Sequence, residues 1–307
     1  MELRTLRYFL AVAYEGNITH AAESLYISQP SLTRQIQLLE EELGCKLFVR
    51  KRHCVELTPE GLELRSRAIE ALQIIENIEQ DFANRGDREI SGSVFVAAAE
   101  TAGMRTIARV AAKVRAKHPG IILELTTGDA FSVADRLDKG LADIAVFCEP
   151  ASVAKYHSRR LSEMDTWGVL MRADDPLAQK EAIVSSDFAH RPCYISAQQR
   201  STEHETNPFR TWMGRRRGQF KTAGTLDLVR NAATMVAESG ELALTFEGIG
   251  GYTGDDLVFR PLSPTLQTGS FAAWKRGRTF SDAARLFIDT LKEELVIDAQ
   301  RVNGSTD

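Results

Sequence analysis

Residues 17–36 read NITHAAESLYISQPSLTRQI, and they carry the clearest structural signal in the first part of the chain. Apolar residues recur at helical spacing on both sides of the short segment 26–28. Asn17 and Ser28 can accept the hydrogen bonds of a helix N-terminus, and Pro30 falls in a first helical turn, where its missing N–H costs nothing. The stretch therefore predicts two helices joined by a turn of about four residues, a helix-turn-helix.

The second of these helices presents a face of hydrogen-bonding side chains opposite its apolar stripe. Arginine can bind guanine through two hydrogen bonds, glutamine can bind adenine, and serine or threonine can contact a base or a phosphate. This face predicts a helix that reads DNA, with an ordinary solvated surface as the alternative. The predicted contacts are Thr19, Gln29, Pro30, Ser31, Thr33, Arg34 and Gln37.

Residues 46–58, KLFVRKRHCVELT, predict a two-stranded wing with a basic tip. Apolar and polar residues alternate on both sides of Arg50, Lys51 and Arg52. Cations at this tip would contact phosphates and release counterions, although a solvated turn would have the same composition.

Residues 59–86 predict one long amphipathic helix, which begins at the breaker sequence Pro59-Glu60-Gly61. A helix of this length needs a partner for its apolar stripe, either in a second copy of the chain or in its own domain. The stripe consists of Leu62, Ile69, Leu72, Ile75, Ile78 and Phe82.

The rest of the chain alternates strands and helices. Strands are predicted at 94–99, 121–126 and 143–148, separated by helices at about 104–117 and 130–139, an order that implies a parallel, doubly wound sheet. A second set of strands follows at 166–171, 193–195, 219–223 and 242–245, with helices near 204–216 and 225–238. A strand at 270–274 and a helix at 281–296 close the domain.

Together these motifs resemble the LysR-type transcriptional regulators. The resemblance is carried by NxTxAAxxL at 17–25, SQPSLTRQI at 28–36, Leu39-Glu40, LGxxLFxR at 43–50 and LTPEG at 57–61, and the length and order of the remaining chain extend it over nearly all 307 residues. Within this motif Asn17, His20 and Cys54 depart from the commoner family residues, and none of them removes an expected contact.

The resemblance implies an α/β protein with three parts. These are an all-α-dominated winged helix-turn-helix at 1–58, a dimerisation linker helix at 59–86, and a two-lobed effector-binding domain at 91–298 with a fold like that of periplasmic binding proteins. Lobe I would hold about 91–160 and 268–298 and lobe II about 161–267, with crossovers near 158–163 and 261–268. The implied partners are double-stranded operator DNA, a small-molecule effector and further copies of the chain in a dimer or tetramer, with RNA polymerase as a candidate.

An effector is expected in the cleft between the lobes, beyond the carboxyl ends of the strands. The residues at those ends are Ala99, Glu100, Thr101, Thr127, Ser196, Gln198, Thr225, Thr245 and Phe246. Hydroxyls and helix N-termini suit the small carboxylates that are common effectors in the family, whereas Glu100 and Glu247 would favour an amine. A simpler role for Glu100 is to complement a helix dipole.

Composition and missing motifs argue against other classes of protein. A net charge of −4 and 43% hydrophobic residues indicate a globular chain rather than a uniformly basic coat protein. No catalytic or nucleotide-binding motif is present, so we expect neither an enzyme nor a cofactor. A zinc site at Cys45, His53 and Cys54 lacks a fourth ligand. Cys193 has no second thiol nearby in its half of the domain for a redox switch, while the sequence leaves the position of Cys148 open. The longest apolar run near the N-terminus has seven residues, so we expect no export or membrane segment and a cytoplasmic protein.

Overall fold

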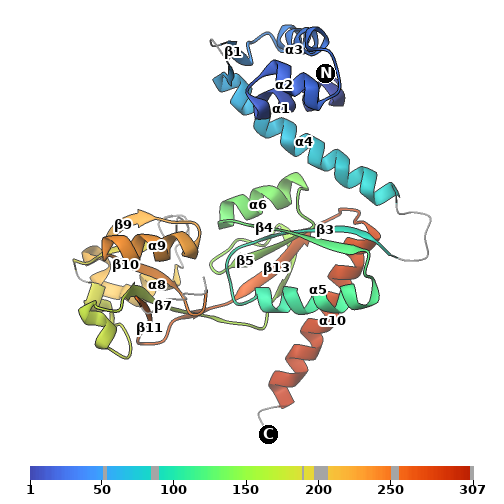
Figure 1. Cartoon of the computed structure of the whole chain (residues 1–307). Helices are drawn as coiled ribbons and strands as arrows, with labels where there is room; N and C mark the ends of the chain where they lie inside the picture. The colour runs from blue at the N-terminus through green and yellow to red at the C-terminus, as the bar shows by residue number, and fades with distance from the viewer. Residues whose placement is uncertain (51–53, 84–89, 189, 197–206, 250–255, 305–307) are drawn as a thin grey trace. The chain divides into compact units, whose positions relative to one another are not determined.

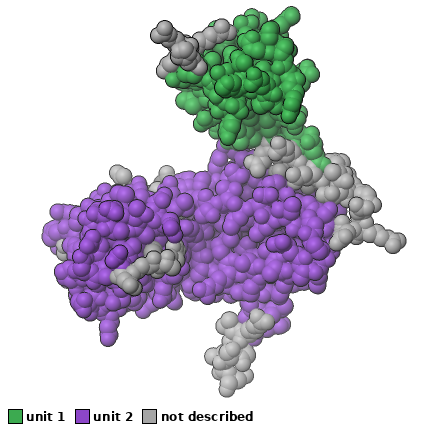
Figure 2. Space-filling view, in the orientation of Figure 1, with its two compact units in different colours: residues 1–85 green, residues 86–307 purple. Residues whose placement is uncertain are grey.

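The computed structural model describes residues 1–50, 54–83, 90–188, 190–196, 207–249 and 256–304. The chain forms two compact units, residues 1–85 and residues 86–307 (Figure 2).

The first unit contains the predicted helix-turn-helix and wing. Its elements are α1 (Leu3–Glu15), α2 (Ile18–Ser24), α3 (Gln29–Leu43), β1 (Phe48–Arg50), β2 (Val55–Leu57) and α4 (Pro59–Ala83) (Figure 1). Asn17 caps α2 as expected, because its Oδ1 accepts the amides of Thr19 at 2.8 Å and His20 at 3.4 Å. The Oγ of Ser28 accepts the amide of Ser31 at 3.4 Å at the start of α3. Strands β1 and β2 pair antiparallel.

The start of α4 is fixed against the wing. Thr58 donates its hydroxyl to the carbonyl of Lys46 at 2.7 Å and accepts the amide of Gly61 at 2.9 Å. A Cβ at position 61 would collide with the carbonyl oxygen of Leu47. The glycine in the breaker sequence is therefore required by close packing of the helix on β1.

The apolar residues of α4 divide between two environments. Ala68 and Leu72 are buried in the core of the first unit. Leu62, Ile69 and Ile78 are 50%, 51% and 47% exposed. The helix thus packs partly on its own domain and leaves a second apolar stripe uncovered in the single chain.

The second unit contains two sheets. The first sheet has the order β4-β3-β5-β13-β6, with α5 and α10 packed on one face and α6 on the other. Alternate residues of β3, β5 and β13 belong to the two different cores, which explains why these strands are apolar throughout. The elements are β3 (Gly92–Ala98), α5 (Met104–Lys117), β4 (Ile121–Thr127), α6 (Ala130–Lys139), β5 (Ile144–Cys148), β6 (Tyr156–Arg160), β13 (Ser270–Lys275) and α10 (Asp282–Gly304).

The second sheet has the order β11-β7-β10-β8-β9, and β12 also pairs with β7. Helix α9 packs on one face, while α8 and an aromatic cluster pack on the other. The elements are β7 (Asp165–Arg172), β8 (Pro192–Ile195), α8 (Pro208–Met213), β9 (Lys221–Thr225), α9 (Val229–Ser239), β10 (Leu242–Phe246), β11 (Leu257–Pro261) and β12 (Gln267–Thr268), with 3₁₀ turns at Pro176–Gln179, Ser185–Phe188 and Gly214–Gln219.

The structure confirms the parallel arrangement of the first three strands of this unit, adds three strands, and shortens one predicted helix. Strands β4, β3 and β5 are parallel, as the β-α-β-α-β order implied, but β13 runs antiparallel to β5 and β7 runs antiparallel to β10. Strands β6, β11 and β12 were not predicted; β6 reads YHSRR, which has no apolar alternation. The helix expected at 204–216 occupies only Pro208–Met213 among the described residues, followed by a 3₁₀ turn.

The crossovers lie close to the predicted ranges. The first follows β6, which extends to Arg160 in the first sheet. The second lies at Gly269, because β12 still pairs with β7 and β13 begins at Ser270.

Candidate DNA interface and effector pocket

The outward face of α3 is exposed and largely unpartnered. Thr19, Gln29, Pro30, Ser31, Arg34 and Gln37 are exposed, and Thr33 is half-buried. Gln29 donates its amide to the Oγ1 of Thr33 at 2.9 Å, so these two side chains order each other. No hydrogen bond or ion pair to Arg34 is found within the described part of the chain. Its guanidinium is therefore available to a ligand outside the protein.

The wing is described only up to its tip. Arg50 pairs with Val55 in the β1–β2 ladder, but its side chain, like Lys51 and Arg52, lies outside what the structure describes. The phosphate contacts predicted for this tip therefore remain predictions.

Glu40, on α3, connects this helix to the wing. Its carboxylate accepts the amides of Leu47 at 2.9 Å and Phe48 at 3.3 Å and pairs with Lys46 at 2.6 Å. Burial alone would raise the pKa of Glu40, but these hydrogen bonds outweigh burial and lower the pKa. The reading helix and the first wing strand are thus held together by one buried carboxylate.

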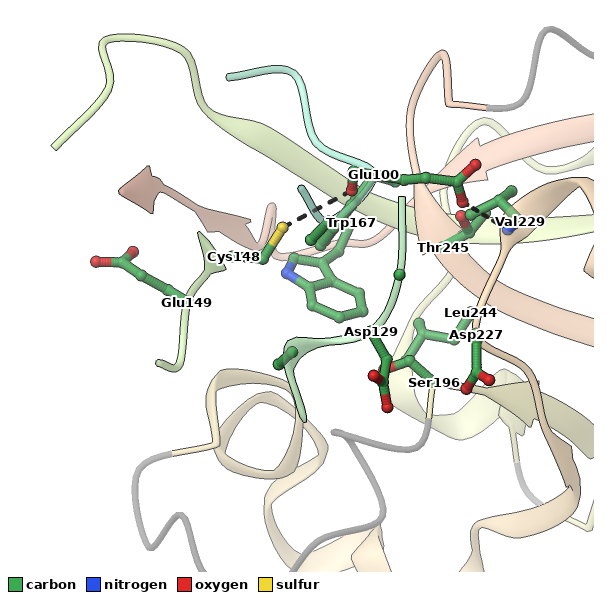
Figure 3. Close-up of a pocket in the computed structure, with 14 residues that line it drawn as sticks. Glu100, Asp129, Cys148, Glu149, Trp167, Ser196, Asp227, Val229, Leu244 and Thr245 are labelled. Atoms are coloured by element: carbon green, nitrogen blue, oxygen red, sulfur yellow. Dashed lines mark hydrogen bonds between the residues drawn. The ribbon is translucent and has the colours of Figure 1, made fainter. Parts of the chain in front are cut away.

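A pocket with about 640 Å³ of empty space, open solvent included, is lined by residues of both lobes (Figure 3). Lobe I contributes Ala99, Glu100, Gly128, Asp129, Ala130, Cys148 and Glu149, and lobe II contributes Trp167, Ser196, Asp227, Val229, Leu244, Thr245 and Phe246.

Five of the nine residues predicted for an effector line this pocket: Ala99, Glu100, Ser196, Thr245 and Phe246. Thr127 and Thr225 do not line it; they are exposed residues at the ends of β4 and β9, the outer strands of the two sheets. Gln198 lies outside the described residues. Glu247 is exposed and also lies outside the lining.

Thr101 was predicted to contact the effector but is used inside the fold. Its buried hydroxyl donates to Asp165 at the start of β7, and the amide of Ala102 donates to the same carboxylate at 2.7 Å. Burial raises the pKa of Asp165, although these two donors oppose the rise. Thr101 therefore joins lobe I to the first strand of lobe II instead of facing the pocket.

Glu100 bridges the two lobes across the pocket. Its Oε2 accepts the amide of Val229, the first residue of α9, at 2.7 Å, as Figure 3 shows. The carboxylate thus satisfies an N–H group at the positive end of α9. The sequence left two roles open for Glu100, a cleft residue or a residue that complements a helix dipole. In the structure Glu100 has both roles.

Several lining residues were missed by the sequence prediction. Glu149 directly follows β5, so the strand-end rule that selected Glu100 would also have selected it. Asp227 lies two residues before α9, and nothing in the sequence distinguished it from an ordinary polar loop residue. Trp167 lies inside β7, and only the packing of the two lobes brings it to the pocket.

The remaining predictions about chemistry concern metals, thiols and membranes. The described residues contain no group of three potential metal ligands, and His53 is not among them. Burial raises the pKa of Cys148 to about 12, and burial also raises the pKa of Cys193, so neither thiol has the low pKa of a redox sensor. Of the described helices, none is both long and apolar enough to span a bilayer.

A winged helix-turn-helix and a two-lobed domain with a pocket between its lobes define a class of ligand-binding regulatory proteins. The family model described as "LysR substrate binding domain" matches residues 87–296, and the model "Bacterial regulatory helix-turn-helix protein, lysR family" matches residues 3–62. The chain therefore belongs to the LysR family.

Known relatives agree with this assignment. The chain is 34% identical over 153 residues to the transcriptional activator IlvY of Salmonella typhimurium, a match that spans 50% of this chain and 52% of that protein, about half of each. It is 27% identical over 297 residues to the regulator YvbU of Bacillus subtilis, covering 95% of this chain and 98% of that one. The crystal structure of CbnR, a LysR family transcriptional regulator, aligns with a TM-score of 0.72 at 17% identity and covers 96% of this chain and 99% of that one. These names describe regulators rather than enzymes.

Proposed function

We propose that this protein is a sequence-specific, DNA-binding transcriptional regulator that responds to a small-molecule effector held between the lobes of its second unit. The observation that carries the proposal is the exposed polar face of α3 in a winged helix-turn-helix, in the same chain as an interlobe pocket. A related structure that aligns over 95% of this chain is CbnR in complex with its target DNA. We place the protein in the cytoplasm, where its DNA target is found.

In this proposal α3 enters the major groove. Gln29, Ser31, Thr33, Arg34 and Gln37 would contact base edges or phosphates, and Thr19 and Pro30 would contact the adjoining backbone. Arg50, Lys51 and Arg52 would hold phosphates from the wing. Phosphate contacts supply most of the affinity in such complexes, and base contacts supply the specificity.

The uncovered stripe of α4 supports a dimer or tetramer. Leu62, Ile69 and Ile78 would pack on the same helix of a second chain, because apolar residues at helical spacing favour such pairing. Two reading helices in a two-fold dimer would contact half-sites about one DNA turn, or a multiple of it, apart. RNA polymerase is a candidate partner of the DNA-bound oligomer.

Effector control requires a ligand that binds two arrangements of the protein with different affinities. The interlobe contact between Glu100 and Val229 is suited to this purpose because a ligand in the pocket lies beside it. Closing or opening the lobes would then change the geometry of the DNA-binding units through the linker helices.

The test is binding of the full-length protein to the DNA upstream of its own gene, measured by fluorescence anisotropy across a range of salt concentrations. We expect salt-sensitive, specific binding that Arg34→Ala weakens by about 1–3 kcal/mol, the range for an arginine that contacts guanine.

Arg105→Ala is the matched control, since Arg105 is an exposed arginine on α5 in the other unit. It removes the same charge and should leave the affinity unchanged. Equal affinities of wild type and Arg34→Ala would refute the assignment of Arg34. No specific binding to any genomic fragment by the folded oligomer would refute the regulator function.

A further inference from the structure

We infer that the interlobe pocket takes a small organic cation, an ammonium group on an apolar body, rather than a carboxylate. This inference rests on the proposed function, since it names the chemical class of the effector for that pocket. It follows from where the protein's own carboxylates lie around the pocket.

The helix ends that would attract an anionic effector already carry acidic side chains. A helix N-terminus binds anions because its first amides have no partner within the helix. At α9 the free amide of Val229 is taken by Glu100 at 2.7 Å. At α6 the amide of Ser132 is taken by Asp129 at 2.8 Å. An incoming carboxylate would have to displace these groups and lie against their charge.

The acidic lining is only partly neutralised. Glu149 is paired with Arg160 at 3.1 Å. Glu100 and Asp129 contact amides but no cation, and no partner of Asp227 is found in the described part of the chain. Among the described lining residues none is lysine, arginine or histidine. Its described residues therefore include three carboxylates without a counter-charge, an arrangement that attracts cations and repels anions.

A buried hydroxyl in the lining gives an independent sign of a ligand. Thr245 is only 5% exposed and lines the pocket, yet its Oγ1 has no hydrogen-bond partner among the described residues. A buried polar atom of this kind costs free energy unless a ligand or a water satisfies it. Thr245 and Glu100 line the same pocket, so a ligand ammonium group would find both a hydroxyl and a carboxylate there as acceptors.

The rest of the lining suits an apolar body. Trp167 and Phe246 meet edge to face with ring centroids 4.4 Å apart, and Leu244 and the buried Cys148 complete the surface. Aromatic faces bind organic cations favourably. The described carboxylates form no group able to hold a metal ion, so an extended organic cation fits them better than a bare ion.

The test uses isothermal titration calorimetry of the full-length protein with benzylammonium, benzoate and benzyl alcohol. These three ligands share one aromatic ring and differ in charge. We expect a Kd for benzylammonium at least about tenfold below that for benzoate, with benzyl alcohol between them. Asp227→Asn should raise the Kd for benzylammonium about fivefold, the factor contributed by one opposite charge at contact distance in water-like surroundings. Glu247→Gln removes a neighbouring exposed carboxylate outside the lining and is the matched control, expected to stay within twofold of wild type.

Three results would overturn the inference: tighter binding of benzoate than of benzylammonium, binding of neither compound at millimolar concentration, or an equal loss in Asp227→Asn and Glu247→Gln. None of these results would count against the proposed function, because operator binding by the protein without ligand is measured separately. Failure of operator binding would count against the proposed function whatever the amine results are.

Discussion

Replacing Glu40 by alanine should destabilise the DNA-binding unit without touching its DNA-facing surface. The carboxylate of Glu40 is 8% exposed and accepts two main-chain amides of the wing, from Leu47 and Phe48. Alanine would leave these donors without a partner beside the buried side chain of Leu47.

The magnitude follows from the three contacts. A hydrogen bond to a charged acceptor contributes about 1.5–3 kcal/mol, and the bond at 2.9 Å should reach that range while the bond at 3.3 Å contributes less. The ion pair with Lys46 adds at most about 0.5 kcal/mol because the lysine is exposed to solvent. We expect Glu40→Ala to cost about 2–4 kcal/mol of unfolding free energy. Glu40→Gln keeps one acceptor and should cost roughly half as much.

The assay is urea denaturation of the full-length protein followed by two signals. Trp167, Trp212 and Trp274 all lie in the second unit, so tryptophan fluorescence reports on that unit alone. Far-ultraviolet circular dichroism reports on the helices of both units. Unfolding of the first unit appears in the circular dichroism signal but not in the fluorescence signal. Glu40→Ala should lower the urea concentration at the midpoint of that transition. The midpoint of the fluorescence transition, which reports on the second unit, should not change.

The pH dependence gives a second check. Because the pKa of Glu40 is lowered by folding, its contribution is fully present above its ordinary value near 4.5 and is lost as the pH falls through the folded pKa. The difference between wild type and Glu40→Ala should therefore shrink below about pH 4.5. Glu41→Ala, at the exposed neighbouring position, is the control and should cost less than about 0.5 kcal/mol. Equal effects of the two variants, or a constant difference down to low pH, would refute this account of Glu40.

Two further predictions concern Thr101 and Cys148, which both lie in the second unit. Thr101→Val should destabilise it by about 1–3 kcal/mol at pH 7, because buried Asp165 loses a donor to its charged form. Since the pKa of Asp165 is already raised, this loss should decrease as the pH falls and the carboxyl is protonated; a pH-independent loss in fluorescence-monitored unfolding would contradict it. In native protein at pH 8, iodoacetamide should label exposed Cys54 and spare Cys148, whose pKa is raised to about 12 by burial. Mass spectrometry showing rapid labelling of Cys148 would be inconsistent with its burial.

The DNA-binding unit was predictable from the sequence because its signals are local. Asn17 and Ser28 cap helices, Pro30 occupies a first turn, and the apolar residues Leu32, Ile36 and Leu39, at steps of four and three, mark the buried side of α3. Such signals act within a few residues of one another, so they need no knowledge of the rest of the chain. The predicted helices and the wing strands agree with the structure within a few residues.

The second unit was predictable in its parts but not in its pairing. The apolar strands β3, β4 and β5 were identified because a strand buried on both faces is apolar throughout. Strand β6 was missed, since the polar run YHSRR becomes a strand only through its pairing with β13, more than a hundred residues later in the chain.

The pocket residues were likewise predicted only in part. The strand-end rule placed Ala99, Glu100, Ser196, Thr245 and Phe246 at the cleft, because the carboxyl ends of parallel strands meet at one edge of a sheet. The rule could not tell that Thr101 turns inward to Asp165 or that Asp227 and Trp167 reach the pocket.

The helix-turn-helix, its polar face, the long helix and the apolar strands of the second unit could thus be predicted from the residues, because capping, periodicity and strand burial depend on residues that are close in the sequence. The division into two lobes was implied by the resemblance to the LysR family. Which carboxylates cap helix ends and which line the pocket without a partner among the described residues became known from the folded structure. That outcome depends on contacts such as Glu100 with Val229, which join residues 129 positions apart and exist only when the two lobes are folded against each other.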